Sequence, residues 1–155
     1  MHDHADALRR LQAHYDAMPP VAAIGPHVAG YDGERLCLGA PLARHVNDKG
    51  CAFGGSLGSL LTLAAWGLLH VRLEQAGVDA DIYVADSTVR FLAPLFDDLR
   101  AEATLAPGSN WEAFIATLRS RGRARVEVVA EVPLPVGGIA TSFSARYVAI
   151  RRPGR

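Results

Sequence analysis

Residues 47–57 read N-D-K-G-C-A-F-G-G-S-L, and an apolar run continues them to Val71. A polar loop, a pair of glycines and a long uncharged segment predict a helix with an accessible N-terminus. Between Phe53 and Val71 only the imidazole of His70 can carry a charge. At about 1.5 Å per residue, a helix over 54–76 would be about 33 Å long, the diameter of a small domain. Apolar residues cover most of its circumference, so we expect this helix to be buried.

The predicted helix has one bulky side and one small side, since residues repeat at about 100° intervals. The bulky side suits a core, and the small side lets a backbone or a ligand come close. The bulky side carries Leu57, Leu60, Leu61, Ala64, Leu68 and Val71. The small side carries Gly54, Gly55, Gly58, Ser59, Thr62 and Ala65.

A membrane span is the alternative interpretation of this run, which is close to the minimum of about 18 residues. Its glycines and hydroxyl residues, and the lack of a basic flank, argue against it. We therefore expect no membrane span.

The whole chain has the composition of a soluble globular protein, with 155 residues, 50% hydrophobic and 21% charged. We expect one domain over 1–155, in which 1–25 form an N-terminal helix and its connection and 152–155 a short tail. The formal net charge is zero, so nothing supports a nucleic-acid partner.

Two cysteines are too few for a disulfide scaffold, and the polar first residues lead us to expect no signal peptide. These features predict a cytoplasmic protein with reduced thiols. The histidines form no metal-binding pattern, so we expect no metal site and no cofactor.

The remaining segments alternate between helical and strand patterns. A helix over 5–18 is expected to end at Pro19-Pro20, and Ser109 to Glu112 fit a capping box before a short helix closed by Gly122. Strands are expected at 27–31, 34–43, 82–92, 98–105, 123–132 and 139–151. This order predicts an α+β fold, a curled antiparallel sheet of five to six strands around the long helix, although the link from 105 to 123 is also long enough for a crossover.

Several short motifs, in order along the chain, resemble the thioesterase-like domain found at the C-terminus of YiiD-type proteins, a hot-dog fold family. The resemblance runs from about Leu8 to Ile150, and its most specific part is Phe-Gly-Gly-Ser-Leu with the downstream Trp-Gly. The motifs are Tyr31-Asp32-Gly33, Ala40-Pro41-Leu42, Asn47, Lys49-Gly50, Phe53-Gly54-Gly55-Ser56-Leu57, Ala65-Trp66-Gly67-Leu68-Leu69 and Phe91-Leu92-Ala93-Pro94.

The resemblance implies hydrolysis of an acyl thioester of coenzyme A or an acyl carrier protein. It also implies a homodimer or a dimer of dimers with its sites between subunits. The backbone N–H groups of Gly54 and Gly55, at the positive end of the helix, suit a developing oxyanion. Asn47 would orient the carbonyl or the attacking water, and the expected substrate-binding residues are Phe53, Ser56, Ser59 and Ser87.

The chain departs from the pattern of many hot-dog thioesterases. Phe53 stands where they have histidine, and Thr62 stands where they have the acidic residue. Without a base, water is a poor nucleophile, and positioned acid–base help contributes about 10² to 10⁴ in rate. Asp48 and Asp86 are the nearest candidate bases. Asp48 can equally be a solvated loop residue or cap, and Asp86 can equally pair with an arginine on a neighbouring strand.

Other polar residues near the glycines also have two interpretations. Asn47 can cap its loop or contact substrate. The hydroxyls of Ser59 and Thr62 can hold a water molecule, or bond to the helix carbonyl four residues earlier. Cys51 is more economically a small buried side chain than a nucleophile.

Two other functions remain open. One is a dehydratase or hydratase acting on acyl thioesters, which normally requires a histidine near the helix start. The other is a non-catalytic acyl-ligand binding or assembly module, which the missing helix acid favours.

Overall fold

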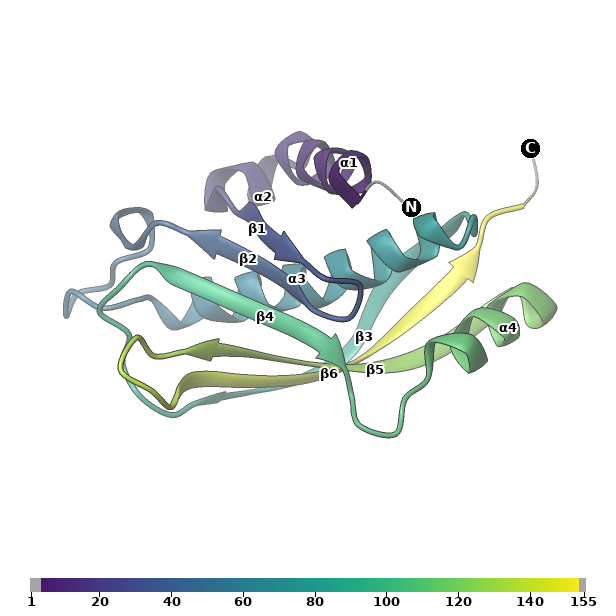
Figure 1. Cartoon of the computed structure of the whole chain (residues 1–155). Helices are drawn as coiled ribbons and strands as arrows, with labels where there is room; N and C mark the ends of the chain where they lie inside the picture. Colours follow the sequence, from purple (N-terminus) through teal and green to yellow (C-terminus); the bar gives the residue numbers. More distant parts are fainter. Residues whose placement is uncertain (1–3, 154–155) are drawn as a thin grey trace.

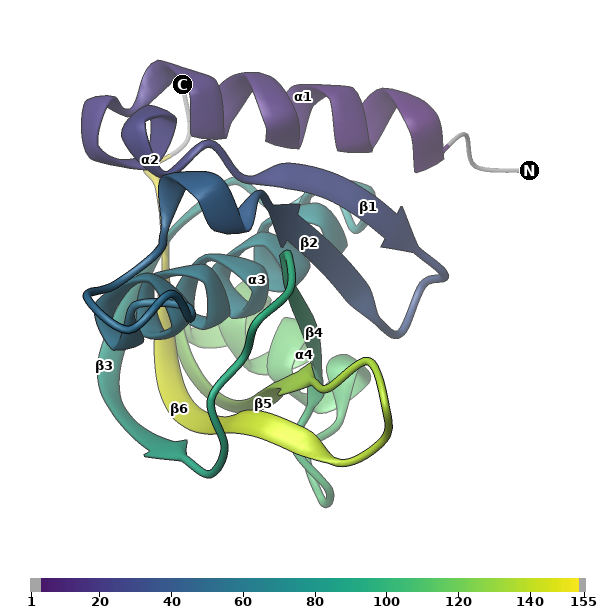
Figure 2. The same ribbon diagram turned by 90° about the vertical axis from the view of Figure 1, so that its left-hand side faces the viewer.

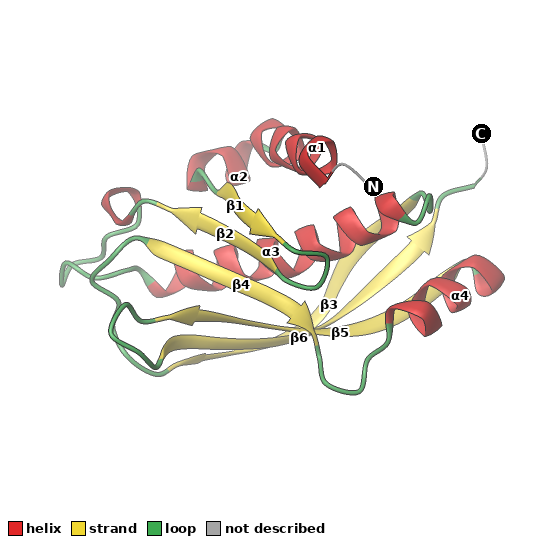
Figure 3. Ribbon diagram, in the orientation of Figure 1, coloured by secondary structure: helices red, strands yellow, loops and turns green. Residues whose placement is uncertain are grey.

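The computed structural model describes residues 4–153, which form four α-helices and one six-stranded sheet (Figures 1 and 3). The helices are α1 (His4–Ala17), α2 (Pro19–Ile24), α3 (Gly54–Gln75) and α4 (Trp111–Arg121). The strands are β1 (His27–Tyr31), β2 (Leu36–Ala40), β3 (Ala80–Phe91), β4 (Leu99–Leu105), β5 (Arg123–Pro133) and β6 (Ile139–Arg151). The predicted α+β class is confirmed, with six strands.

The sheet has the order β1-β2-β4-β5-β6-β3, and every neighbouring pair is antiparallel. The link between β4 and β5 is therefore not a crossover. The sheet curls around α3, and α1 and α2 lie above β1 (Figure 2). The strands at the two edges of the sheet are β1 and β3, which leaves one side of each free of strand neighbours.

The long helix α3 is the predicted one, beginning at Gly54 and ending one residue earlier than expected. Gly77 follows its end with φ +72°, a left-handed conformation that glycine adopts without strain. All residues of the bulky side are at most 4% exposed, which confirms their place in the core.

The small side of α3 is only partly covered by this chain. Gly54, Gly58, Ser59 and Thr62 are half-buried, and Gly55 is exposed. Ala65, also on the small side, is fully buried because it lies one turn beyond Leu61 on the core-facing boundary.

The apolar composition of α3 is explained by its packing. By length and composition α3 could cross a membrane, since an 18-residue stretch of it has a mean hydropathy of 1.3. However, 56% of that stretch is buried inside the protein. A central core helix has this composition for the same reason that a membrane helix does.

Two buried tyrosines hold the middle of α3. Tyr15 of α1 donates a hydrogen bond to the carbonyl of Leu63 at 2.7 Å, and Tyr147 of β6 donates one to the carbonyl of Thr62 at 2.8 Å. Burial raises the pKa of both phenols, so both hydroxyls stay protonated and can donate. These bonds attach α3 to α1 on one side and to the sheet on the other.

Two expected helix boundaries differ from the structure. Pro19 and Pro20 do not only end α1, because they also occupy the first positions of α2, where a missing N–H costs nothing. The cap of α4 is Asn110 rather than Ser109, since the Asn110 side chain accepts a hydrogen bond from the Ala113 N–H at 3.0 Å. Gly122 closes α4 as predicted.

Candidate active site

The N-terminus of α3 presents two unused backbone donors. Phe53 is the N-cap, with extended backbone and no side-chain cap, and its carbonyl accepts from the N–H groups of Ser56 and Leu57. Within residues 4–153 the N–H groups of Gly54 and Gly55 have no acceptor. Two free donors at the positive end of a helix are suited to an anion or a polarised carbonyl oxygen.

Two aromatic rings flank these donors. A Cβ on Gly54 would lie 3.4 Å from the ring of Phe91, and a Cβ on Gly55 would lie 2.6 Å from the ring of Phe53. Both rings are largely exposed, Phe53 by 56% and Phe91 by 60%. The Phe53 ring therefore requires glycine at position 55, whereas a Cβ on Gly54 would make only an ordinary contact with Phe91. Both donors lie beside apolar surface.

Asn47 caps the loop that leads into α3. Its Oδ1 accepts from the N–H of Lys49 at 2.8 Å and from the N–H of Cys51 at 3.2 Å. Asp48 is exposed and pairs with the neighbouring Lys49 at 2.9 Å. The structure thus shows the capping interpretation of Asn47 and the solvated interpretation of Asp48.

The hydroxyl residues of the small side differ from one another. Thr62 donates to the carbonyl of Gly58 at 2.8 Å, as predicted. The same prediction is wrong for Ser59, whose half-buried hydroxyl makes no hydrogen bond to the described residues. Ser87 lies on β3 opposite Ala145, on the face of the sheet that covers α3.

Asp86 lies on the opposite face of β3 because the strand contains a bulge. The pairing with β6 shifts between Val84 and Asp86, so Val84 and Ser87 face α3 while Asp86 faces away. An unbroken alternation along β3 would put Asp86 on the same face as Val84, and the bulge reverses the faces beyond Val84. Asp86 pairs with the exposed Arg146 at 2.5 Å, which confirms the ion-pair interpretation. Within one chain the structure does not bring Asp86 to Gly54.

His45 is the residue that sequence reasoning missed. It is only 6% exposed, and its Nδ1 lies 2.8 Å from the hydroxyl oxygen of Ser56. Its Nε2 lies 2.7 Å from the carbonyl oxygen of Ile24. No local pattern signals this arrangement, since the histidine precedes the serine by 11 residues and a loop separates them.

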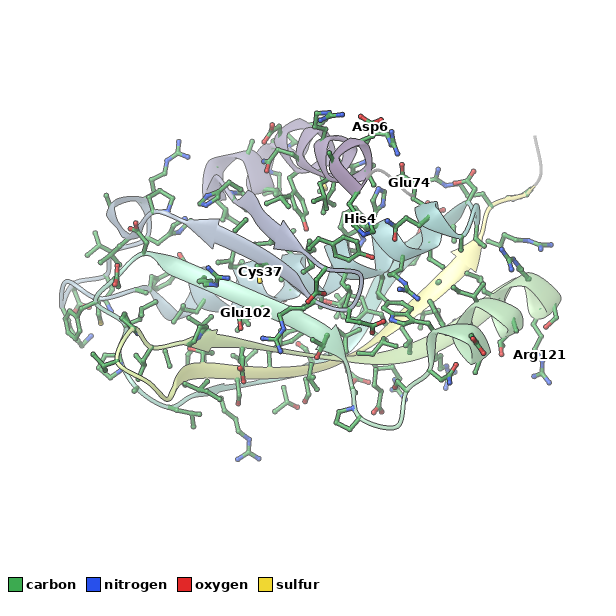
Figure 4. The ribbon with its side chains drawn as sticks, in the orientation of Figure 1. His4, Asp6, Cys37, Glu74, Glu102 and Arg121 are labelled. Atoms are coloured by element: carbon green, nitrogen blue, oxygen red, sulfur yellow. The ribbon has the colours of Figure 1, made fainter. Side chains whose placement is uncertain are left out.

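Neither cysteine is placed as a nucleophile. Cys51 is 6% exposed and contacts Asn47. Cys37 of β2 lies opposite Glu102 of β4, as Figure 4 shows. Burial raises the pKa of the Cys37 thiol, and the Glu102 carboxylate raises it further, so the thiol stays protonated.

A cavity of about 540 Å³ lies beside the second half of α3 and the beginning of β3. Its wall includes Trp66, whose ring stacks on His70 with the ring centroids 4.9 Å apart, and His14 of α1. Burial lowers the pKa of the His70 imidazole, and the neighbouring His14 lowers it further. Among residues 4–153 no group of three or more His, Cys, Asp or Glu side chains could hold a metal ion.

A curled antiparallel sheet packed on one long central helix defines the hot-dog class of folds. The chain belongs to the family described as "Putative thioesterase (yiiD_Cterm)", whose model matches residues 8–151.

Solved structures share the whole fold. A protein of unknown function from Chlorobaculum tepidum is 24% identical, with a TM-score of 0.86, and the match covers 93% of this chain and 94% of that one. A protein from Shewanella oneidensis described as a putative thioesterase is 25% identical, with a TM-score of 0.84 and coverage of 94% and 99%. A Pseudomonas aeruginosa protein described as a probable thioesterase is 20% identical, with a TM-score of 0.79 and coverage of 97% of both chains.

Proposed function

We propose that this protein hydrolyses acyl thioesters of coenzyme A or an acyl carrier protein at the N-terminus of α3. The observation that carries the proposal is the pair of free N–H groups at Gly54 and Gly55. When a nucleophile attacks a thioester, negative charge develops on the carbonyl oxygen. Donors that already point at that oxygen stabilise the transition state without reorganisation.

The surroundings of the glycines suit the acyl part of such a substrate. Phe53 and Phe91 expose apolar surface beside the donors, and Leu92, which follows Phe91 in the chain, is 60% exposed. An exposed apolar patch of this kind marks a ligand-binding or protein-binding surface. It supports binding of an acyl chain, a second subunit, or both together.

The proposed site lies between two copies of the chain. Strand β3 is a 12-residue edge strand that exposes Tyr83 by 56% and Val84 by 45%, and a long exposed edge of this kind pairs readily. If two β3 strands pair antiparallel over their full length, Phe91 of one copy lies opposite Ala80 of the other. The ring of Phe91 lies beside Gly54, and Ala80 lines the cavity beside Trp66. The free donors of one copy would therefore adjoin the cavity of the other.

The alternatives fit this geometry less well. A dehydratase or hydratase of this fold normally uses a histidine paired with a carboxylate near the helix start. Phe53 fills that position in the sequence. The buried His45, which the structure brings to the first turn of α3, is bonded to Ser56 and to the Ile24 carbonyl rather than to a carboxylate. A non-catalytic acyl-binding module remains the competing function, because neither Asp48 nor Asp86 meets the donors within one chain.

The substitution Gly54→Pro tests the donor directly. Proline at the first helical position removes the N–H and no helical hydrogen bond, and the extended backbone of Phe53 accepts a following proline. Loss of one oxyanion donor lowers kcat by about 10²- to 10³-fold. Gly54→Ala is the matched control, since it adds a Cβ and keeps the N–H.

The measurement is thiol release from acyl-coenzyme A esters of increasing chain length, followed with a thiol reagent. We expect turnover in the wild type, a small loss in Gly54→Ala and a large loss in Gly54→Pro. Binding of an acyl-coenzyme A without thiol release from any ester would favour the binding module instead.

A further inference from the structure

The hydrogen bonds of His45 determine which of its nitrogens carries the proton. The carbonyl of Ile24 can only accept, so Nε2 is the protonated nitrogen and donates to it at 2.7 Å. In the neutral ring Nδ1 then holds a lone pair, and the Ser56 hydroxyl donates to it at 2.8 Å. A serine hydroxyl donating to an imidazole whose other nitrogen is anchored is the arrangement that activates a serine.

The third group in this series is a backbone carbonyl rather than a carboxylate. Ile24 is the last residue of α2, so its carbonyl has no partner in its own helix and lies at the negative end of that helix. It fixes the orientation of the ring and holds the proton on Nε2, so that Nδ1 faces the Ser56 hydroxyl.

Ser56 also stands beside the proposed oxyanion donors. It is the third residue of α3, directly after Gly54 and Gly55. Ser56 keeps part of its surface exposed, whereas His45 behind it is buried. A thioester carbonyl bound at the glycines would therefore approach the Ser56 hydroxyl from the solvent side. His45, the base, contacts the same hydroxyl from the protein side.

We propose that Ser56 is a covalent nucleophile and His45 its general base, an inference that rests on the proposed thioester hydrolysis. Ser56 Oγ forms a bond to the carbonyl carbon and its proton moves to His45 Nδ1. The carbon–sulfur bond then breaks, and the departing sulfur takes the electron pair and the proton from Nδ1. Water then attacks the carbonyl carbon of the acyl-serine and gives a proton to Nδ1. The bond between that carbon and Oγ breaks, Oγ takes the proton back from Nδ1, and the carboxylic acid is released.

This pair supplies the base that α3 lacks. Thr62, in the position of the helix acid, is bonded to its own helix. His45 acts from the loop before α3 instead, and Ser56 replaces water as the first nucleophile.

The test is intact-mass measurement after an acid quench of the protein mixed with an acyl-coenzyme A, with peptide mapping of the adduct. We expect a mass increase of one acyl group on the peptide that holds Ser56. Ser56→Ala should lose the adduct and lower kcat by about 10²- to 10⁴-fold with its circular dichroism spectrum unchanged. Ser120→Ala, an exposed hydroxyl on α4, is the matched control that keeps full activity.

A fluorophosphonate probe, whose phosphorus bonds to Oγ as fluoride leaves, examines Ser56 without a thioester. We expect the probe to label Ser56 in the wild type and to label it less in His45→Asn. If Ser56→Ala or His45→Asn fails to fold, the mapped adduct of the wild type decides the question. Thiol release with no adduct, and Ser56→Ala turning over like the wild type, would overturn the inference and leave hydrolysis standing. An adduct without turnover would support the nucleophile and reject hydrolysis, and absence of thiol release, adduct and label would reject both.

Discussion

The Asn47 side chain caps the loop before α3, and it is also a candidate for contact with the substrate. Its Oδ1 is occupied by the N–H groups of Lys49 and Cys51. Its Nδ2 lies 3.2 Å from the sulfur of Cys51, a weak acceptor, so this amide nitrogen retains donor capacity for a substrate carbonyl. Capping and substrate contact thus use different atoms, and substitutions can separate them.

Asn47→Asp keeps the capping oxygen and removes the amide donor. We expect its thermal midpoint to stay near that of the wild type, while kcat/KM for thiol release falls about 5- to 30-fold, the loss of about 1 to 2 kcal/mol. Asn47→Ala should lose both stability and activity because the two backbone N–H groups lose their acceptor. Unchanged kcat/KM in Asn47→Asp would mean that Asn47 only caps the loop.

At the scale of the element, α3 has a different environment on each side. Gly67 lies where Tyr15 crosses the helix, and a Cβ there would come 2.1 Å from the Tyr15 hydroxyl and 2.8 Å from Leu36. Gly58 lies on the small side, where a Cβ would meet no atom within 4 Å. Packing within this chain therefore requires glycine at position 67 but not at position 58.

Gly67→Ala and Gly58→Ala form a matched pair within one helix. We expect Gly67→Ala to lower the free energy of unfolding by about 1 to 3 kcal/mol, because the methyl group displaces Tyr15 and Leu36. Gly58→Ala should raise it by up to about 1 kcal/mol, because alanine favours the helix. Urea unfolding of both variants is the measurement. Destabilisation by Gly58→Ala would indicate that a second copy packs closely on the small side.

At the scale of the whole molecule, the free edge of the sheet determines what this chain can assemble with. Strand β3 pairs with β6 on one side only, and exposed apolar side chains run along it beside the half-covered side of α3. An edge of this length and composition favours pairing with an identical edge, because antiparallel self-pairing obeys two-fold symmetry.

Val84→Lys places a charge in the middle of this edge. We expect light scattering after size exclusion to show a dimer in the wild type and a monomer in the variant, with thiol release lost together with the dimer. Val136→Lys makes the same change in the turn between β5 and β6, where the side chain is 93% exposed, and should leave the dimer intact. A wild type that is monomeric at assay concentration and fully active would contradict a site between subunits.

The parts of the fold that could be predicted are those encoded by neighbouring residues. The apolar run after Gly54-Gly55 predicted α3 because its bulky side repeats every three to four residues. The strand expected at 139–151 has the same bounds as β6. The face on which Asp86 lies could not be predicted in this way, since the bulge between Val84 and Asp86 leaves no mark in the alternation itself.

The sequence by itself determined a buried helix with a glycine-marked N-terminus in an antiparallel α+β fold, because periodicity and glycine act over a few residues. Only the tertiary structure decided which polar groups meet there. Asp86 went to the outer face with Arg146, and His45 was folded against Ser56 by the loop between them. Such contacts join residues far apart in the chain, and they depend on loop paths and strand registers that no local pattern encodes.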